Sequence, residues 1–315
     1  MMISVSRFGA AFALTLFGLC GGAHAGPAIQ TWSTPNGARV FYVENHALPL
    51  VDVQVDFRAG GAESPAGKTG VAGLTHALLD NGAGDLDEEA IANRIADLGA
   101  QMGGSADMDR ASITLRTLSS AAERDGAVDL LATVIQHPTF PAASFEREKA
   151  RTLAGLKESD TQPDAILSRR FAAAVFPGHP YGRLPTVDSV AALNRDDLAA
   201  FHARTYTAAR AVVSIVGDVS RAEAEAMAAK LTADLPRGEA PATSVNTVLP
   251  GWIVTDMTQR SVNNEKFAGA VLPRIPARRW GEIDDFGGIA VYLASAASAY
   301  TTGEQFVIDG GYTKF

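Results

Sequence analysis

In the first part of the chain, several short segments place hydrophobic residues at the spacing of a β-strand. Residues 51–57 carry valine or phenylalanine at every second position, with aspartate and glutamine between them, a pattern that predicts a strand with one buried face. Residues 111–118 alternate in the same way, and the apolar run within 210–219 predicts a buried strand. A Pro-Asn-Gly turn at 35–37 predicts a hairpin whose second strand covers 40–43.

Between these strands, the spacing of hydrophobic residues changes to that of a helix. Val71, Leu74 and Leu78 fall on one face, so they predict an amphipathic helix, which we expect the Asn81-Gly82 pair to end through a left-handed residue. Further helices are predicted over 87–99, 121–136, 143–158 and 194–204. Antiparallel strands with helices segregated between them favour an α+β fold for this part of the chain.

A short segment rich in proline, glycine and alanine, residues 235–244, precedes a different pattern. Residues 244–252 predict a short apolar strand that leads into a Pro-Gly turn, and residues 304–313 predict a terminal strand. Between them, residues 281–298 predict a helix. Its apolar face consists of Phe286, Ile289, Ala290 and Leu293.

Length and composition agree with two segments of globular structure. A chain of 315 residues is long enough for about two domains, and we predict them over 27–236 and 244–315, with a linker over 237–243. The composition, 47% hydrophobic and 20% charged, is typical of a globular protein. The formal net charge of −8 argues against nonspecific nucleic-acid binding, which needs a basic surface.

Residues 1–25 have the pattern of a secretory signal peptide. Arg7 precedes an apolar stretch from Phe8 to Cys20, and Ala23-His24-Ala25 supplies a small-x-small cleavage signal. Cleavage after Ala25 predicts a periplasmic or secreted protein, and no later apolar run is long enough to span a membrane. Because Cys20 is the only cysteine, the mature chain would hold neither a disulfide nor a thiolate metal site.

Five stretches of residues 27–236 carry a family resemblance. They read, in order, NGARVFYVEN, DFRAGGAESPAGKTGVAGLTHALLDNGAG, HPTFPAASFEREKA, HPYGRLPTVDSVAALNRDDLAAFHARTY and VVSIVGDV. Along nearly its whole length this segment resembles one half of a pitrilysin-type (insulinase, M16) peptidase. The resemblance implies an antiparallel sheet with helices, in a half that closes with a second half around a peptide.

The zinc motif of active M16 peptidases is degenerate in this sequence. The resemblance implies a His-x-x-Glu-His helix, whose histidines bind zinc and whose glutamate activates water, and a third ligand, a glutamate on a later helix. Here His76 occupies the first ligand position, Leu79 replaces the general base and Asp80 replaces the second histidine. Gly155 or Ala154 stands where the third ligand belongs. Since leucine can neither accept a proton nor polarise water, we predict no catalytic residue in this segment.

His76 is thus the only ligand position that survives. A single histidine on an amphipathic helix is most often a packed or surface side chain, and zinc needs three or four ligands. We interpret His76 as the remnant of a site that holds no metal. The alternative is a weak metal contact shared by His76 and Asp80.

Other ionisable residues of this segment predict no further site. The remaining histidines, at 46, 137, 179 and 202, are scattered along the sequence. Glu146, Glu148 and Glu158 are expected to form a solvated helix face.

Two stretches of residues 244–315 carry a second resemblance, SVNTVLPGWIVTDM and RIPARRWGEIDDFGGIAVYLASAASAYTTGEQFVIDGGYT. They resemble the C-terminal part, about the last quarter, of a short-chain dehydrogenase/reductase, a Rossmann-type α/β fold. The resemblance implies that the Pro250-Gly251 turn faces the nicotinamide, that Thr255 touches the cofactor and that the final strand completes a parallel sheet.

The rest of a reductase site is missing from the sequence. No Thr-Gly-x-x-x-Gly-x-Gly turn is present to bind a pyrophosphate. No tyrosine has a lysine four positions later, so the general acid of hydride transfer is absent. We therefore interpret Pro250, Gly251 and Thr255 as vestigial cofactor-binding positions and predict that the protein uses no cofactor.

Three interpretations of function follow. The favoured one is an exported, non-catalytic M16 peptidase-like protein that binds peptide or an active M16 peptidase subunit, fused to a reductase tail. The first alternative is an oxidoreductase of the short-chain dehydrogenase/reductase type, which the missing cofactor turn and Tyr/Lys pair oppose. The second alternative is a fusion or assembly product without function as a whole, because the two segments normally serve different compartments.

Overall fold

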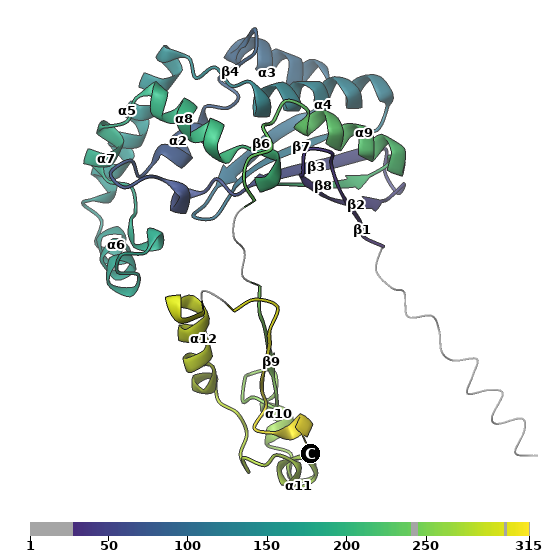
Figure 1. Ribbon diagram of the computed structural model, residues 1–315, viewed down its shortest axis with the longest axis vertical. Helices are drawn as coiled ribbons and strands as arrows, with labels where there is room; N and C mark the ends of the chain where they lie inside the picture. The colour runs from purple at the N-terminus through teal and green to yellow at the C-terminus, as the bar shows by residue number, and fades with distance from the viewer. Residues whose placement is uncertain (1–27, 241–244, 299–300, 315) are drawn as a thin grey trace, which may run out of the picture. The chain divides into compact units, whose positions relative to one another are not determined.

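Six strands of residues 28–240 form one sheet in the order β1-β2-β8-β3-β7-β6 (Figure 1), and the short strands at Gly82–Ala83 (β4) and Leu86–Asp87 (β5) pair separately. The bounds of the six strands are Gln30–Ser33 (β1), Arg39–Glu44 (β2), Leu50–Phe57 (β3), Gln101–Ala106 (β6), Ala111–Leu118 (β7) and Ala211–Gly217 (β8). Neighbouring strands are antiparallel except β2 and β8, which are parallel. The computed structural model describes residues 28–240, 245–298 and 301–314, so the predicted signal peptide lies outside the described residues. The chain divides into two units, Met1–Pro241 and Ala242–Phe315.

The alternating pattern of β3 is confirmed as the centre of the core. Val53 lies opposite Leu115 of β7 on one side and Ile215 of β8 on the other, and these three side chains are all buried. The predicted hairpin is also confirmed, because β1 pairs with β2 and Gly37 in the turn has a φ of 107°, a conformation that favours glycine.

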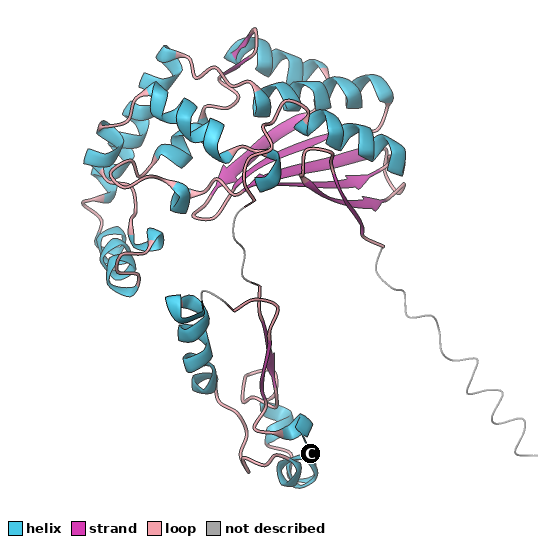
Figure 2. Ribbon diagram, viewed as in Figure 1, coloured by secondary structure: helices cyan, strands magenta, loops and turns pink. Residues whose placement is uncertain are grey.

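Three helices lie along one face of the sheet, as Figure 2 shows: α3 (Glu88–Asp97), α4 (Ala121–Gln136) and α9 (Arg221–Thr232). The apolar side of α4, which includes Leu131 and Ile135, is fully buried. The opposite face of the sheet carries polar side chains, among them Asp52, Gln54 and Arg116, which line a shallow depression.

Five further helices gather beyond one end of the sheet (Figure 1). They are α2 (Val71–Ala77), α5 (Ala142–Ser159), α6 (Pro163–Val175), α7 (Val187–Ala191) and α8 (Arg195–Thr205). α5 and α8 confirm the helices predicted over 143–158 and 194–204. α6 was not predicted, and it buries none of its side chains.

The second unit is built on two short parallel strands, β9 (Thr247–Pro250) and β10 (Gln305–Ile308). Helices α10 (Gln259–Val262) and α11 (Glu265–Val271) follow β9. The helix predicted over 281–298 is broken into a 3-10 turn at Ile283–Phe286 and helix α12 (Gly287–Ala294). Among its described hydrophobic residues, only Val262, Val271 and Ile275 are buried. The face predicted for α12 is only partly covered, because two strands offer too little sheet to pack against.

Among the described residues, no helix has the length and hydrophobicity needed to cross a membrane.

Candidate functional site

Helix α2, which carries the degenerate zinc motif, is shorter than predicted. It ends at Ala77, and the next two N–H groups, those of Leu78 and Leu79, bond to carbonyls only three residues back. Gly82 does not provide the expected left-handed stop. It lies in the two-residue strand β4 (Gly82–Ala83), and the left-handed residue is Gly84, with a φ of 56°.

Gly82 packs closely against the segment that follows α4. A Cβ atom on Gly82 would lie 2.6 Å from the hydroxyl of Thr139 and 2.8 Å from the ring of Pro141. The backbone at Gly82 is therefore extended and lies against this segment, which is distant in the sequence. As a result, His76 lies in the last turn of α2 whereas Asp80 lies beyond its end.

The imidazole of His76 forms a hydrogen bond with the backbone. Its Nε2 lies 3.0 Å from the carbonyl oxygen of Ser112, and since a carbonyl only accepts, Nε2 carries the proton and donates. The ring also abuts Gly104 of β6, where a Cβ atom would lie 3.0 Å from Nε2 and would collide with the Ser112 carbonyl. Only glycine fits between His76 and the sheet at this position.

The other positions of the motif offer no ligand set. Leu79, at the position of the general base, is 3% exposed and belongs to the hydrophobic core. Asp80 is exposed, and partial desolvation raises the pKa of its carboxyl. Gly155 lies on the exposed surface of α5, with open space where its side chain would be. These residues do not fit a zinc ion.

Within residues 28–240, 245–298 and 301–314, no group of three or more His, Cys, Asp or Glu side chains is arranged to hold a metal ion. The alternative of a His76/Asp80 contact is weakened further because the two residues share no helical turn.

A cleft of about 470 Å³ lies between α2 and α5, beside the degenerate motif. Its walls include Leu74 of α2, Thr152 of α5 and Met108, which follows β6. Glu148 of α5 lines it too, with a side chain that is 16% exposed and paired with Arg151 at 2.7 Å. The expectation that Glu148 lies on a solvated face is therefore wrong, whereas Glu146 and Glu158 are exposed. Sequence reasoning missed this cleft because its walls come from segments far apart in the chain.

Strand β6 forms one edge of the sheet. Within the part of the chain that the structure describes, it pairs with β7 alone. Gly103, Gly104 and Ser105 in the middle of the strand are exposed. The edge runs past His76, so it presents backbone groups next to the degenerate motif.

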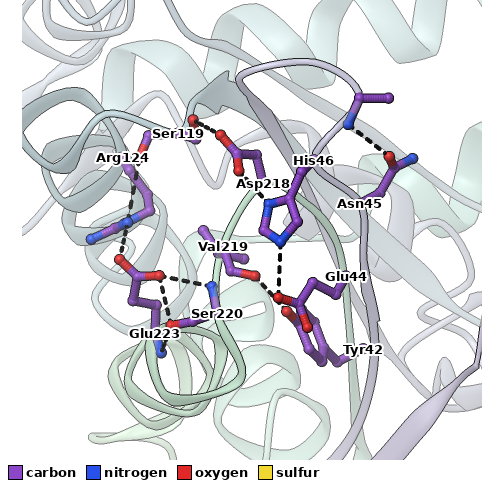
Figure 3. Close-up of polar contacts among 11 residues, drawn as sticks. Tyr42, Glu44, Asn45, His46, Ser119, Arg124, Asp218, Val219, Ser220 and Glu223 are labelled. Carbon is purple, nitrogen blue, oxygen red and sulfur yellow. Dashed lines mark hydrogen bonds and ion pairs between the residues drawn. The ribbon is translucent and has the colours of Figure 1, made fainter.

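A polar cluster at the ends of strands β2, β7 and β8 was also missed by sequence reasoning (Figure 3). The His46 ring lies between two carboxylates, with Nδ1 2.5 Å from Asp218 and Nε2 2.9 Å from Glu44. These contacts raise the pKa of His46, the Asp218 hydrogen bond most of all. Ser119 donates to the other oxygen of Asp218 at 2.6 Å.

This cluster does not have the order of a catalytic triad. A serine nucleophile needs the imidazole next to its hydroxyl, with the carboxylate behind the imidazole. Here Asp218 stands between Ser119 and His46, so no base can take the hydroxyl proton by way of the ring. The cluster instead ties together three strand ends and, through Arg124 and Glu223 at 2.7 Å, the starts of α4 and α9.

In the second unit, Pro250 is the last residue of β9 and Gly251 follows it. The Gly251 N–H donates to the carbonyl of Ile308 at 2.9 Å, and a Cβ atom on Gly251 would lie 2.5 Å from the Cα of Asp309. Glycine is thus required where the two strand ends meet. Thr255 is exposed, and its hydroxyl accepts from the N–H of Thr258 at 3.3 Å in the turn before α10. Gly251 and Asp309 therefore lie close together, whereas the Thr255 side chain makes a local contact in the turn before α10.

Two family models match the chain. The Insulinase (Peptidase family M16) model matches residues 39–185, and the Enoyl-(Acyl carrier protein) reductase model matches residues 204–313. The second match begins within α8, so it also covers β8 and α9 of the first unit.

Solved structures that are similar to the chain include a peptidase M16 domain, pitrilysin and part of a periplasmic protease. A peptidase M16 inactive domain from Pseudomonas fluorescens is 36% identical, with a TM-score of 0.66, over 72% of this chain and 57% of that one. Pitrilysin is 20% identical, with a TM-score of 0.60, over 72% of this chain and 26% of that one. The first half of the periplasmic protease PqqL from Escherichia coli is 17% identical, with a TM-score of 0.58, over 72% and 52%. The last two show the fold alone.

Curated relatives match the tail. A 2-dehydro-3-deoxy-D-gluconate 5-dehydrogenase from Bacillus subtilis is 48% identical over 68 residues, 22% of this chain and 27% of that enzyme. A gluconate 5-dehydrogenase from Gluconobacter oxydans is 41% identical over 69 residues, again 22% and 27%. The chain therefore spans about a quarter of the length of these enzymes.

These matches confirm both resemblances and the α+β fold. The first unit has the fold of an M16 peptidase domain, and the second is similar to the C-terminal part of a short-chain dehydrogenase/reductase.

Proposed function

We propose that this protein is an exported, non-catalytic M16 peptidase-like protein that binds an extended peptide or an active M16 peptidase subunit. The observation that carries the proposal is the edge of β6, which runs past His76 and beside the cleft between α2 and α5. An exposed sheet edge binds an extended peptide by adding it as a further strand. The cleft offers a place for a side chain of that peptide.

The proposed lack of catalysis follows from the chemistry of the motif. Hydrolysis by zinc needs a base beside the metal-bound water, and Leu79 in the core cannot act as one. The fold of an M16 domain without its ligand set is suited to binding rather than cleavage. The similarity to a peptidase M16 domain described as inactive supports the same proposal.

An apolar stripe on α6 supports binding of a partner protein. Leu167, Phe171 and Val175 are spaced by four residues, so they lie on one side of the helix, and they are 66%, 65% and 48% exposed. Exposed apolar patches of this kind mark interaction surfaces.

Peptide binding can be tested with N-methylated probes. Only every second N–H of an added strand faces the sheet edge, so N-methyl groups at one set of alternate positions are expected to abolish binding, measured by fluorescence anisotropy. The matched control is the same peptide methylated at the other set, which should bind normally. Equal binding of both would contradict strand addition, and chelator-sensitive cleavage of the unmethylated peptide would contradict a non-catalytic role.

Export is tested separately by expressing the full chain in a bacterial host. We expect the protein in the periplasmic fraction, with a mature N-terminus at Gly26. A protein that keeps residues 1–25 and stays in the cytoplasm would refute this part of the proposal.

A further inference from the structure

The cleft between α2 and α5 contains an arginine that lacks a side-chain partner among the described residues. Arg183 lines the cleft, and its Nε atom is buried and makes no hydrogen bond to any residue that the structure describes. Within the described residues, the guanidinium of Arg183 also has no ion pair. A buried donor that lacks an acceptor is costly, and a charged donor that lines a cleft can gain its acceptor from an anionic ligand.

The acidic groups of the cleft do not neutralise this charge. Glu148 is paired with Arg151 at 2.7 Å. Asp107 accepts the backbone N–H groups of Asp109 and Arg110 at 2.7 and 2.8 Å, and the Arg110 side chain lies 3.5 Å away. The hydrogen bond from the Arg110 N–H, and to a smaller extent that from the Asp109 N–H, lowers the pKa of Asp107. Among the described residues that line the cleft, each carboxylate thus has its own cation, and Arg183 is left without a carboxylate partner.

We propose that Arg183 binds a carboxylate of a peptide whose neighbouring apolar side chain fills the cleft between α2 and α5. A guanidinium presents donors in a planar fork that matches a carboxylate. The apolar part of the ligand would contact Ala72, Leu74, Met108 and Pro185, which belong to the wall of the cleft. This inference rests on the proposed peptide binding and adds to it the chemical class of the recognised group.

The carboxylate could be the C-terminus of the peptide or an aspartate or glutamate side chain. One apolar hexapeptide in four forms separates these sources: a free C-terminus, an amidated C-terminus, an internal glutamate with an amidated C-terminus, and the glutamine analogue of that third form. The affinity of each fluorescent peptide is measured by anisotropy on the full-length protein.

We expect a carboxylate form to bind about 10- to 100-fold more tightly than its neutral counterpart, as charge-assisted hydrogen bonds allow. Arg183→Gln and Arg183→Met should abolish this difference, whereas Arg170→Gln, an equal charge change at an exposed position of α6, should preserve it. Thermal unfolding of each variant checks the fold, and Arg183→Met keeps the aliphatic part of the side chain. The pair of peptides that shows the difference identifies the source of the carboxylate.

Two results would overturn the inference in distinguishable ways. If the peptides bind but acid and neutral forms bind equally, or the difference survives Arg183→Met, carboxylate recognition is wrong and peptide binding stands. If no form binds, peptide binding and the role of Arg183 fail together.

Discussion

The Nε2 atom of His76 donates a hydrogen bond to the carbonyl oxygen of Ser112 at 3.0 Å, which ties the last turn of α2 to strand β7. His76, which occupies the surviving ligand position, therefore has a structural role. We expect metal analysis of the purified protein to find no stoichiometric zinc and a chelator to leave the melting temperature unchanged. A melting temperature that rises with added zinc would contradict this expectation.

His76→Ala should destabilise the protein by about 1–3 kcal/mol, because it leaves the Ser112 carbonyl without its donor. His76→Gln can restore a donor and should recover part of the loss. Chemical denaturation measures both variants. Equal stabilities for the wild type and His76→Ala would show that the hydrogen bond contributes nothing.

The general base cannot be restored by one substitution. Leu79 is 3% exposed, so Leu79→Glu places a carboxylate in the core and should cost more than about 3 kcal/mol. Leu79→Met keeps the volume and should cost less than about 1.5 kcal/mol. If denaturation shows that both variants are equally stable, Leu79 does not lie in the core.

At Gly155, the position of the third ligand, we expect a substitution to stabilise the protein, in contrast to Leu79. Gly155 lies inside α5 with open space around its Cβ position. Gly155→Ala should therefore stabilise the protein by about 0.5–1 kcal/mol through helix propensity. Gly104→Ala is the contrasting control, because its Cβ would collide with the Ser112 carbonyl, and it should be strongly destabilising.

We expect the His46–Asp218 pair to contribute most to the stability of the protein within a limited pH range. The pKa of His46 is raised from 6.5, mainly by Asp218, so its contribution is present below about 6.5 and lost as the pH rises through the folded pKa. The pKa of Asp218 is lowered from 3.8 by its hydrogen bonds with Ser119 and His46, so its contribution is lost as the pH falls through the folded pKa. The pair therefore stabilises most between about pH 4 and 6.5.

The measurement compares wild type and His46→Gln by denaturation across this range. The difference in unfolding free energy should be larger at pH 5 than at pH 9. In an Asp218→Asn/Glu44→Gln background the pH dependence of the difference should disappear. A difference that is constant with pH in the native background would show that His46 titrates without these partners.

Limited proteolysis should cut first within residues 236–275. In the second unit, the described hydrophobic residues that are buried number only three, Val262, Val271 and Ile275, and its sheet has two strands. Short sheets with few buried residues rarely resist opening. Mass spectrometry of early fragments checks the site of cleavage, and a tail that survives as long as residues 28–236 would contradict the prediction.

The pattern of the sequence by itself determined strands β2, β3, β7 and β8 and the loss of the zinc motif, whereas the glycine-rich strand β6 was not predicted. The alternation of residues 51–57 predicts β3 because a half-buried strand needs one apolar face, whatever packs against it. The replacement of a glutamate by Leu79 removes a base on chemical grounds that no fold can reverse. The two family resemblances also rest on local stretches of sequence.

Tertiary structure decided where α2 ends, that α6 exists and which side chains meet. α2 ends at Ala77 because Gly82 packs on Thr139 and Pro141, a contact that no local pattern encodes. Helix α6 buries none of its side chains. The apolar periodicity that predicts a helix from its buried face therefore does not identify it.

The His46 cluster and the Arg183 cleft depend on segments far apart in the chain. Asp218 lies 172 residues from His46, and the cleft joins α2, the end of β6, α5 and the segment before α7. Periodicity reports which face of an element is apolar. Only the packing of the elements determines which of their polar groups come within hydrogen-bonding distance, and which, like Arg183, do not.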